Sequence, residues 1–306
     1  MTSLTTILVV GATGLLGEKI ARELLAKESV TTRLLVRVAS TGSAEKQARI
    51  RALQAAGAQV VEGDLHDLES LKRACEGVTA IISSVQGEEN IIVAGQQNLL
   101  RVAEAAGVQR FMPSDYAIDY FKHEEGDNGA FDLRRRFAAI LKASRVPYTI
   151  LLSGAFTEVE LSPWGTLIDE QARTFSYWGD GQTTFDITAS DDVAKYAVEA
   201  ILDPGKANQV VQVAGDVLTM KQFLAIYQEV IGEQLVERQQ GTVEELHAWI
   251  EQQKRTASSW HAYRAYQYHY GLVSGKGKLD SIENTRYPHI HPLTLRAYLE
   301  RQQAQR

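Results

Sequence analysis

Three glycines near the start of the chain have a spacing that suits the binding of an anion. Gly11, Gly14 and Gly17 follow the apolar residues 7–10, and residues with helical spacing come after them. Glycine has no Cβ atom, so the backbone can turn tightly and approach a phosphate, while the free N–H groups at a helix start favour negative charge. The pattern predicts a strand, a loop that binds the diphosphate of a dinucleotide, and a helix. A plain tight turn is the alternative.

A basic residue, Arg37, stands twenty positions after Gly17, where the second strand of such a unit ends. Sites that prefer NAD usually carry an acidic residue there for the ribose 2′-hydroxyl, whereas a guanidinium suits a 2′-phosphate. We therefore predict NADPH as the cofactor; a solvated arginine at a strand end is the alternative. Asp64, which follows Gly63 at the end of the third strand, either borders the adenine or forms a turn.

The elements that position these residues alternate along the first half of the chain. Short β-branched and apolar runs predict strands over 7–10, 32–36, 59–61, 80–83, 110–112 and 148–152. Between them, apolar residues at three- and four-residue spacing predict helices over 18–27, 45–56, 68–75, 91–106 and 131–144. This alternation predicts an α/β fold with a doubly wound parallel sheet of Rossmann type.

The alternation loosens after residue 152, where shorter elements are expected over 191–202, 210–213, 219–231 and 242–253. We expect an NAD(P)-binding Rossmann domain over 1–156. A smaller α+β substrate lobe over 157–306 would contribute some elements back to the sheet. Residues 271–277 are typical of a flexible turn because they contain three glycines.

Composition and charge exclude several classes of function. The chain has 306 residues, of which 44% are hydrophobic and 23% charged, and a formal net charge of −6. We expect a soluble globular protein with no general attraction to nucleic acid or to a membrane surface. The apolar start is too short for a signal peptide or a membrane span. The single cysteine, Cys75, cannot form an internal disulfide, so we expect a cytoplasmic location.

Two further motifs complete a resemblance to a known family. Residues 110–116 read RFMPSDY, residues 146–150 read VPYTI, and residues 190–194 read SDDVA. Together with the glycine loop, these segments make the chain similar to the NmrA-like family of atypical short-chain dehydrogenases. Within that family it resembles the isoflavone reductase and phenylcoumaran benzylic ether reductase group. The similarity runs from the first strand to about Phe156, and residues 190–194 support it.

The resemblance implies roles for residues at the ends of several strands. The diphosphate would be held by Gly11, Thr13, Gly14, Leu15, Leu16 and Gly17. Arg37 would hold the 2′-phosphate, and Ser83, Ser84, Val85 and Gln86 would pass beside the ribose. Pro113 and Ser114 would lie beside the nicotinamide end, and Phe156 would form a wall of the nicotinamide pocket.

The chain departs from the family at the position of its catalytic lysine. Reductases of this group carry that lysine in a segment resembling Phe-acid-aliphatic-Lys, and the matching residues here end in Arg134. Arginine can hold ribose hydroxyls or stabilise an oxyanion, but it does not exchange protons near neutral pH. Arg134 either lines the pocket in this way or is a helix-surface residue next to Arg135 and Arg136.

The catalytic pair of ordinary short-chain dehydrogenases, a tyrosine four residues before a lysine, is also missing from this chain. A proton donor would therefore have to come from elsewhere. Tyr116 follows the fifth strand, on the ligand side of an open sheet, and His123 follows in a loop. Each is a candidate catalytic residue; packing or solvation is the alternative for both. His261 and His269 have no acidic or thiol partner at a usual metal-ligand spacing, so no metal site is predicted.

An aromatic segment near the end of the chain has three possible roles. It contains Trp260, His261, Tyr263, Tyr266, Tyr268, His269 and Tyr270. It could line a pocket for a flat substrate, form the core of the lobe or contribute to a homodimer contact.

Two functions remain open from the sequence. The first is an NADPH-dependent oxidoreductase acting on a small aromatic or carbonyl substrate, which the aromatic second half favours. The second is a non-catalytic NADPH-binding redox sensor of NmrA type, which the missing lysine favours.

Overall fold

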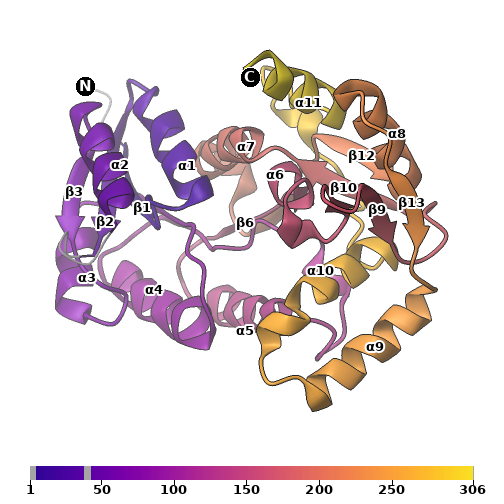
Figure 1. Cartoon of the computed structure of the whole chain (residues 1–306). Helices are drawn as coiled ribbons and strands as arrows, with labels where there is room; N and C mark the ends of the chain where they lie inside the picture. Colours follow the sequence, from indigo (N-terminus) through magenta and orange to yellow (C-terminus); the bar gives the residue numbers. More distant parts are fainter. Residues whose placement is uncertain (1–4, 38–42, 306) are drawn as a thin grey trace. The chain divides into compact units, whose positions relative to one another are not determined.

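The computed structural model describes residues 5–37 and 43–305. The chain forms two compact units and passes from one to the other several times (Figure 1). The first unit contains Met1–Tyr116, Asp132–Leu151 and Val193–Val211, and the second contains Ala117–Phe131, Leu152–Asp192 and Gln212–Arg306.

The first unit is built on a parallel sheet, as the alternating pattern predicts. Its strand order is β3-β2-β1-β4-β5, which places β1 in the middle with crossovers to both sides. The strands are β1 (Thr5–Val10), β2 (Val30–Val36), β3 (Gln59–Glu62), β4 (Ala80–Ser83) and β5 (Arg110–Met112). All four neighbouring pairs are parallel. The α/β fold with a central parallel sheet is therefore confirmed.

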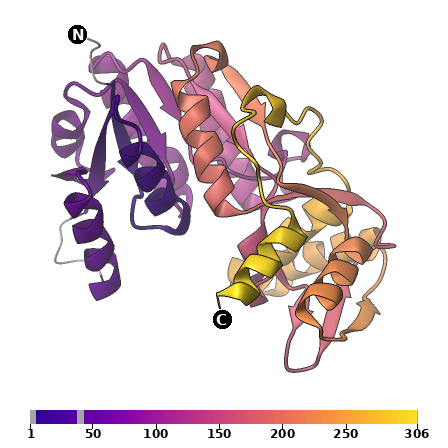
Figure 2. The ribbon, with the colours of Figure 1, turned by 90° about the horizontal axis from the view of Figure 1, so that it is seen from above.

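Helices cover both faces of this sheet (Figures 1 and 2). They are α1 (Leu15–Leu25), α2 (Ala44–Ala55), α3 (Leu68–Cys75), α4 (Gln96–Ala105), α5 (Gly129–Ala143) and α7 (Ser190–Leu202). The central strand β1 is buried on both sides, since Ile7, Leu8, Val9 and Val10 are at most 3% exposed. The apolar runs of the sequence are explained by this double burial.

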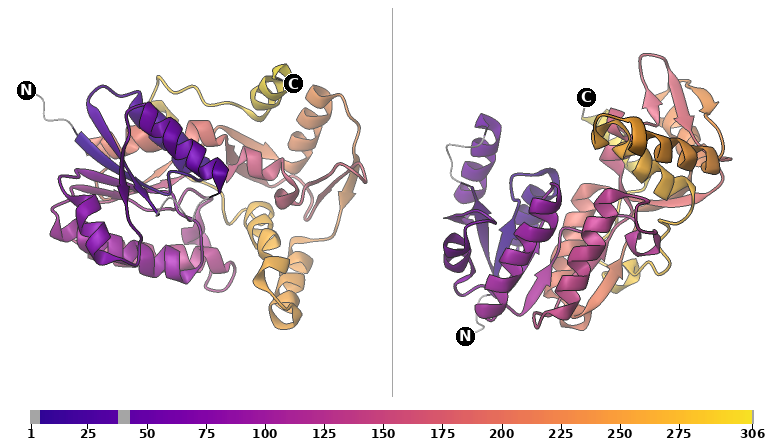
Figure 3. Two further views of the ribbon diagram at one scale, coloured as in Figure 1. Left: turned by 60° about the vertical axis from the view of Figure 1, so that its left-hand side comes forward. Right: turned by 90° about the horizontal axis from the view of Figure 1, so that it is seen from below.

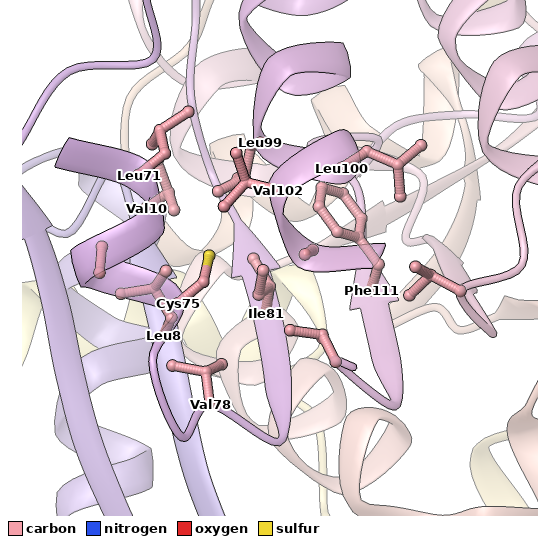
Figure 4. Packing of buried hydrophobic residues seen from close by; sticks show 14 of the residues in the cluster. Leu8, Val10, Leu71, Cys75, Val78, Ile81, Leu99, Leu100, Val102 and Phe111 are labelled. Carbon is pink, nitrogen blue, oxygen red and sulfur yellow. The ribbon is translucent and has the colours of Figure 1, made fainter. Parts of the chain in front are cut away.

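One face of the sheet packs against α3, α4 and α5. Leu8 and Val10 of β1 contribute to this core together with Cys75 of α3 and Leu99 of α4 (Figure 4). Phe137 of α5 belongs to the same cluster. Successive strand residues point to opposite faces, so Leu8 and Val10 share this side of the sheet. The core fixes β1 and β4, whose carboxyl ends carry most of the predicted site.

The sheet continues beyond β5 through a parallel bridge between Phe111 and Tyr148. The Phe111 N–H donates to the Pro147 carbonyl at 2.9 Å. The chain then enters β6 (Thr149–Leu152), which pairs with β11 (Gln209–Gln212). All six strands predicted in the first half are present, each within about two residues of its expected bounds.

A π-helical turn, Asn90–Gly95, precedes α4, so the single helix predicted over 91–106 has two parts. Gln96, at the junction, is fully buried. Its side-chain amide donates to the Ile92 carbonyl at 2.8 Å, and its side-chain oxygen accepts from the Ser114 N–H at 3.1 Å. Gln96 thus links the π-helical turn to the loop after β5.

The second unit combines two small sheets with helices. One sheet has the order β12-β10-β7 and the other β13-β9-β8. The strands are β7 (Ala155–Phe156), β8 (Ile168–Asp169), β9 (Thr174–Tyr177), β10 (Thr184–Thr188), β12 (Asp216–Thr219) and β13 (Val236–Gln239). The helices are α6 (Thr157–Glu160), α8 (Met220–Ile231), α9 (Val243–Thr256), α10 (Arg264–Val273) and α11 (Leu295–Ala304).

Helix α9 packs beside α10, as Figure 3 shows. Capping boxes begin α8 at Thr219 and α9 at Thr242, close to the predicted helix starts. The turn predicted over 271–277 is wrong in its first part, because α10 extends to Val273. A Cβ atom at Gly271 would lie 2.5 Å from the Ile118 side chain, so this glycine permits close packing within the helix. Among the described residues, no helix has the length and apolar composition that a membrane crossing needs.

Candidate functional site

The glycine loop lies between β1 and α1, as the spacing predicts. Gly11 has a φ of +91°, and a Cβ atom there would lie 2.5 Å from the Ser84 carbonyl oxygen. A Cβ atom at Gly17 would lie 2.2 Å from the Gly11 carbonyl oxygen. These two glycines are therefore required by the protein's own packing, because the loop folds against the end of β4 and the first turn of α1.

Gly14 is different, because the protein itself leaves room for a side chain there. Its φ of −82° and ψ of 171° are open to any residue. The nearest atom to an added Cβ would be the Gly11 carbonyl oxygen at 3.4 Å, an ordinary contact. Gly14 is also the N-cap residue of α1. Because glycine has no side chain, it provides no hydrogen-bond acceptor for the N–H groups of the first helical turn. The loop therefore forms a cradle that a Cβ would begin to fill and that suits a diphosphate.

Arg49 of α2 supports this loop from the side, a role that the sequence interpretation missed. Its guanidinium donates to the Thr13 carbonyl at 3.1 Å. It also forms ion pairs with Glu45 at 2.5 Å and Glu18 at 3.4 Å. The Glu45–Arg49 pair has the four-residue spacing of neighbours on a helix. That spacing is visible in the sequence, but the contact with Thr13 is not.

Arg37 follows β2 directly, and its side chain is exposed. An exposed guanidinium at this strand end is available to an incoming phosphate. The contact of Arg37 with a 2′-phosphate stays a prediction. Asp64 lies in the turn after β3, where its carboxylate accepts from the His66 N–H at 2.9 Å. Its own N–H donates to Ser70 Oγ at 3.0 Å. The geometry is that of an Asx turn, and an adenine contact of Asp64 also stays a prediction.

The end of β4 is tied to the end of β1 by one polar contact and to the end of β5 by two. Ser84 Oγ donates to the Val10 carbonyl at 3.1 Å, beside the glycine loop. Ser114 Oγ donates to the Val85 carbonyl at 2.7 Å. The Tyr116 hydroxyl donates to the Ser83 carbonyl at 3.0 Å. The predicted site residues 83–86 and 113–116 therefore meet at the carboxyl edge of the sheet, where open α/β sheets bind ligands.

Tyr116 keeps its proton over the whole neutral range. Burial raises the pKa of its phenol well above the ordinary value, because the charged phenolate loses hydration, and the neighbouring Asp115 raises it further. A phenol of this kind can donate a hydrogen bond. It is a neutral acid that needs an additional change in its surroundings before it gives up its proton near neutral pH.

Arg134 lies on α5 in the first unit and is partly buried. Its neighbours in the sequence have acidic partners, since Arg135 pairs with Asp132 and Arg136 pairs with Glu89 at 2.6 Å. Arg136 is the exposed member of the three. Position and burial are compatible with a pocket role of Arg134, and that role stays a prediction.

His123 and Phe156 belong to the second unit. His123 is buried, with Nδ1 3.7 Å from an Asp127 carboxylate oxygen, and its ring packs on Phe131 at a centroid distance of 4.9 Å. Phe156 ends β7 and is partly buried. The packing interpretation of His123 thus has direct support, while a catalytic role stays a prediction.

A buried acid in the second unit was also missed. Glu160 ends α6, four residues after Phe156, and is 4% exposed. Within residues 5–37 and 43–305 its carboxyl group forms no hydrogen bond or ion pair, and burial raises its pKa to about 8. At such a pKa the carboxyl group of Glu160 is mostly protonated near pH 7. An acidic residue two positions after another, in a short apolar segment, gives no sequence signal of such burial.

The profile of the NmrA-like family matches residues 3–298 of the chain. The protein belongs to the NmrA-like family. Pinoresinol reductase 1 of Arabidopsis thaliana is 29% identical over 313 residues, covering 97% of each chain.

Solved NmrA-like structures share the fold. The crystal structure of an isoflavone reductase superposes with a TM-score of 0.85 at 24% identity, covering 97% of this chain and 99% of that one. The complex of leucoanthocyanidin reductase with NADPH from Vitis vinifera gives a TM-score of 0.83 at 21% identity, covering 97% and 98%. The match extends well beyond Phe156, where the sequence resemblance was expected to end.

Proposed function

We propose that this NmrA-like protein is an NADPH-dependent reductase that acts on a small aromatic or carbonyl substrate. The observation that carries the cofactor assignment is the space at Gly14. Neither its backbone angles nor its neighbours demand glycine, so the missing Cβ is explained by the close approach of a diphosphate. We assign the cofactor to residues 1–156 and the substrate to 157–306.

The relatives support the reaction class. Pinoresinol reductase 1 is named as a reductase of an aromatic compound, and the leucoanthocyanidin reductase structure contains NADPH. In this chain the N–H groups of residues 13–17 would hold the diphosphate. Arg37 would hold the 2′-phosphate, and the carboxyl ends of β4 and β5 would border the ribose and the nicotinamide.

Isothermal titration calorimetry with NADPH tests the cradle. We expect Gly14→Ala to weaken binding at least tenfold, or about 1.4 kcal/mol, because its methyl group takes diphosphate space. Its stability should change by less than about 1 kcal/mol, since the native angles suit alanine. Gly129→Ala is the matched control, because an added Cβ there has its nearest contacts at 3.9 Å. Equal affinity of the Gly14 variant and the natural protein would contradict the assignment.

Arg37 sets the expected preference for NADPH over NADH. Arg37→Asp should reverse this preference, because the carboxylate repels a 2′-phosphate and can accept from a 2′-hydroxyl. Calorimetry with both dinucleotides measures the ratio. Equal affinities of the natural protein for NADPH and NADH would remove the basis of the proposal.

When bound, NADPH supplies a hydride to the substrate. Arg134 would polarise a substrate oxygen or hold a ribose hydroxyl, since its guanidinium donates several hydrogen bonds and keeps its charge. Tyr116 or His123 would provide the proton that the product needs. These three assignments depend on the family resemblance and on the acid–base properties of the side chains.

The loss of NADPH absorbance over a panel of aromatic enones, quinones and aldehydes tests turnover. We expect Arg134→Ala to lower kcat. One of the two variants Tyr116→Phe and His123→Asn should lower kcat about 10²- to 10⁴-fold, namely the one that removes the proton donor. Tyr116→Phe and His123→Asn should keep their affinity for NADPH, measured by calorimetry. A loss of NADPH affinity in Arg134→Ala would assign its guanidinium to the ribose hydroxyl, and unchanged affinity would assign it to the substrate oxygen. Tight NADPH binding without turnover of any compound would instead favour the sensor.

The second candidate function is a redox sensor that binds NADPH and passes its occupancy to a protein partner. One feature favours it: Arg134 stands at the position where the resemblance implies a catalytic lysine. A small-molecule substrate, a cytoplasmic location and a homodimer complete the primary proposal. Sedimentation of the purified protein over a range of concentrations tests the homodimer.

A further inference from the structure

Arg264, the first residue of α10, stacks against two tryptophans. Its guanidinium carbon lies 4.6 Å from the centroid of the Trp260 ring and 6.0 Å from that of Trp164. A guanidinium that stacks on indole rings is held by cation–π attraction through its face. Stacking uses the face of the guanidinium, so it does not occupy the N–H donors in its plane.

This guanidinium has no counter-ion in the described part of the chain. Arg264 forms no ion pair and no hydrogen bond there, and its Nε atom is buried without an acceptor. Arg296 is a contrast, since both its Nη atoms bind the Glu229 carboxylate. A partly buried cation without a partner is unfavourable, because lost hydration is not replaced. The cost is recovered if an external anion completes the site.

The aromatic surroundings of Arg264 are fixed by contacts within the second unit. Trp260 donates its indole N–H to the Gln267 side-chain oxygen at 2.7 Å, and Gln267 in turn donates to the Asp127 carbonyl at 3.1 Å. Trp164 meets Tyr268 edge to face at 5.3 Å. These contacts preorganise the two indole rings, which reduces the entropic cost of binding a ligand.

Trp164 is also one of the few large apolar side chains with a substantial exposed surface. It is 41% exposed, although it packs on Tyr268. An exposed indole beside a stacked cation offers two complementary surfaces. The indole face takes an aromatic ring, and the guanidinium edge takes a carboxylate through paired N–H donors.

We propose that Arg264, Trp164 and Trp260 form a binding subsite for the carboxylate of a flat aromatic molecule. The subsite deepens the proposed function, because it narrows the substrate class of the reductase to aromatic acids, and in that respect it rests on that function. Arg264 is the specificity-determining residue, and the two indoles position it. The test of binding itself needs neither NADPH nor turnover.

Calorimetry of the full chain with cinnamate and with cinnamamide tests the subsite. The two compounds share a ring and a vinyl group and differ in charge at one end. We expect cinnamate to bind at least tenfold more tightly, and Arg264→Gln to remove this preference while the binding of cinnamamide is unchanged. Arg264→Lys should restore part of the preference, because it keeps the charge without the paired donors.

Arg255→Gln is the matched control, because Arg255 is exposed and its Nε donates to the Glu251 carbonyl. It should bind both compounds like the natural protein, and thermal unfolding should show that every variant folds. Equal binding of both compounds, binding of neither, or a preference that survives in Arg264→Gln would overturn the subsite. Phosphate binding as tight as that of cinnamate would also overturn it.

These results are separable from those on the reductase. A charge preference that depends on Arg264, in a protein that binds NADPH but turns over no aromatic acid, would leave the subsite standing and reject the proposed reaction. Turnover of neutral enones only, without any charge preference in binding, would reject the subsite and keep the reductase.

Discussion

The fold changes the charge state of Glu160. Its carboxyl group is buried in the second unit and has no ion-pair partner among the described residues. In the unfolded chain it loses its proton near the ordinary pKa of 4.5, whereas burial raises the folded pKa to about 8. Between these values the folded state binds more protons, so the free energy of unfolding falls as the pH rises.

Glu160→Gln should remove this pH dependence. We expect the variant to gain stability over the natural protein as the pH rises from about 5 to about 8, by at most about 1.4 kcal/mol for each unit. Urea unfolding at several pH values measures the difference. Glu170→Gln, at an exposed position, is the control and should show no such trend. A constant difference between Glu160→Gln and the natural protein would contradict the burial argument.

Side chains differ in how far the sequence predicts them. Gly11 and Gly17 were placed correctly because a strand, a loop and a helix follow one another locally. Arg49, Glu160 and Arg264 were missed because their surroundings come from remote segments. Arg264, for example, meets Trp164 across one hundred residues of chain. The catalytic assignments of Tyr116, His123 and Arg134 stay predictions, since one titratable side chain carries no pattern of its own.

Elements were predicted well wherever a local apolar pattern decides them. The central strands β1 and β4 are buried on both faces, so each contains a short continuous apolar run. The π-helical turn Asn90–Gly95 was not predicted, because its extra residue per turn leaves the apolar spacing nearly helical. The turn over 271–277 was misplaced because Gly271 serves close packing against Ile118 rather than chain reversal.

The π-helical turn has a measurable energetic role through Gln96. Gln96→Leu should leave the buried Ser114 N–H without its acceptor and lower the free energy of unfolding by about 1–3 kcal/mol. Gln97→Leu, the exposed neighbour, is the matched control. Urea unfolding compares the two. Equal stability of both variants would show that the Gln96 contacts contribute little.

On the scale of the whole molecule, the family match covers nearly the full chain, while the two units are each assembled from separate segments. Local patterns predict the parallel sheet of the first unit. They do not predict how residues 117–131 come to belong to the second unit, because that depends on contacts such as Phe131 with Tyr268, at a centroid distance of 5.0 Å. The division of the chain at residue 156 stays a prediction.

The single cysteine lies in the core that packs against β1 and β4. Its thiol can therefore be used to detect opening of this core. Cys75 is fully buried, and burial raises its thiol pKa to about 11. A thiol-specific dye should therefore label the native protein at a rate set by the opening of the first unit. Labelling followed by mass spectrometry should be much slower than in urea. Equally fast labelling under native conditions would mean that this core opens freely. The rate at which this thiol reacts thus measures local opening of the core without any engineered label.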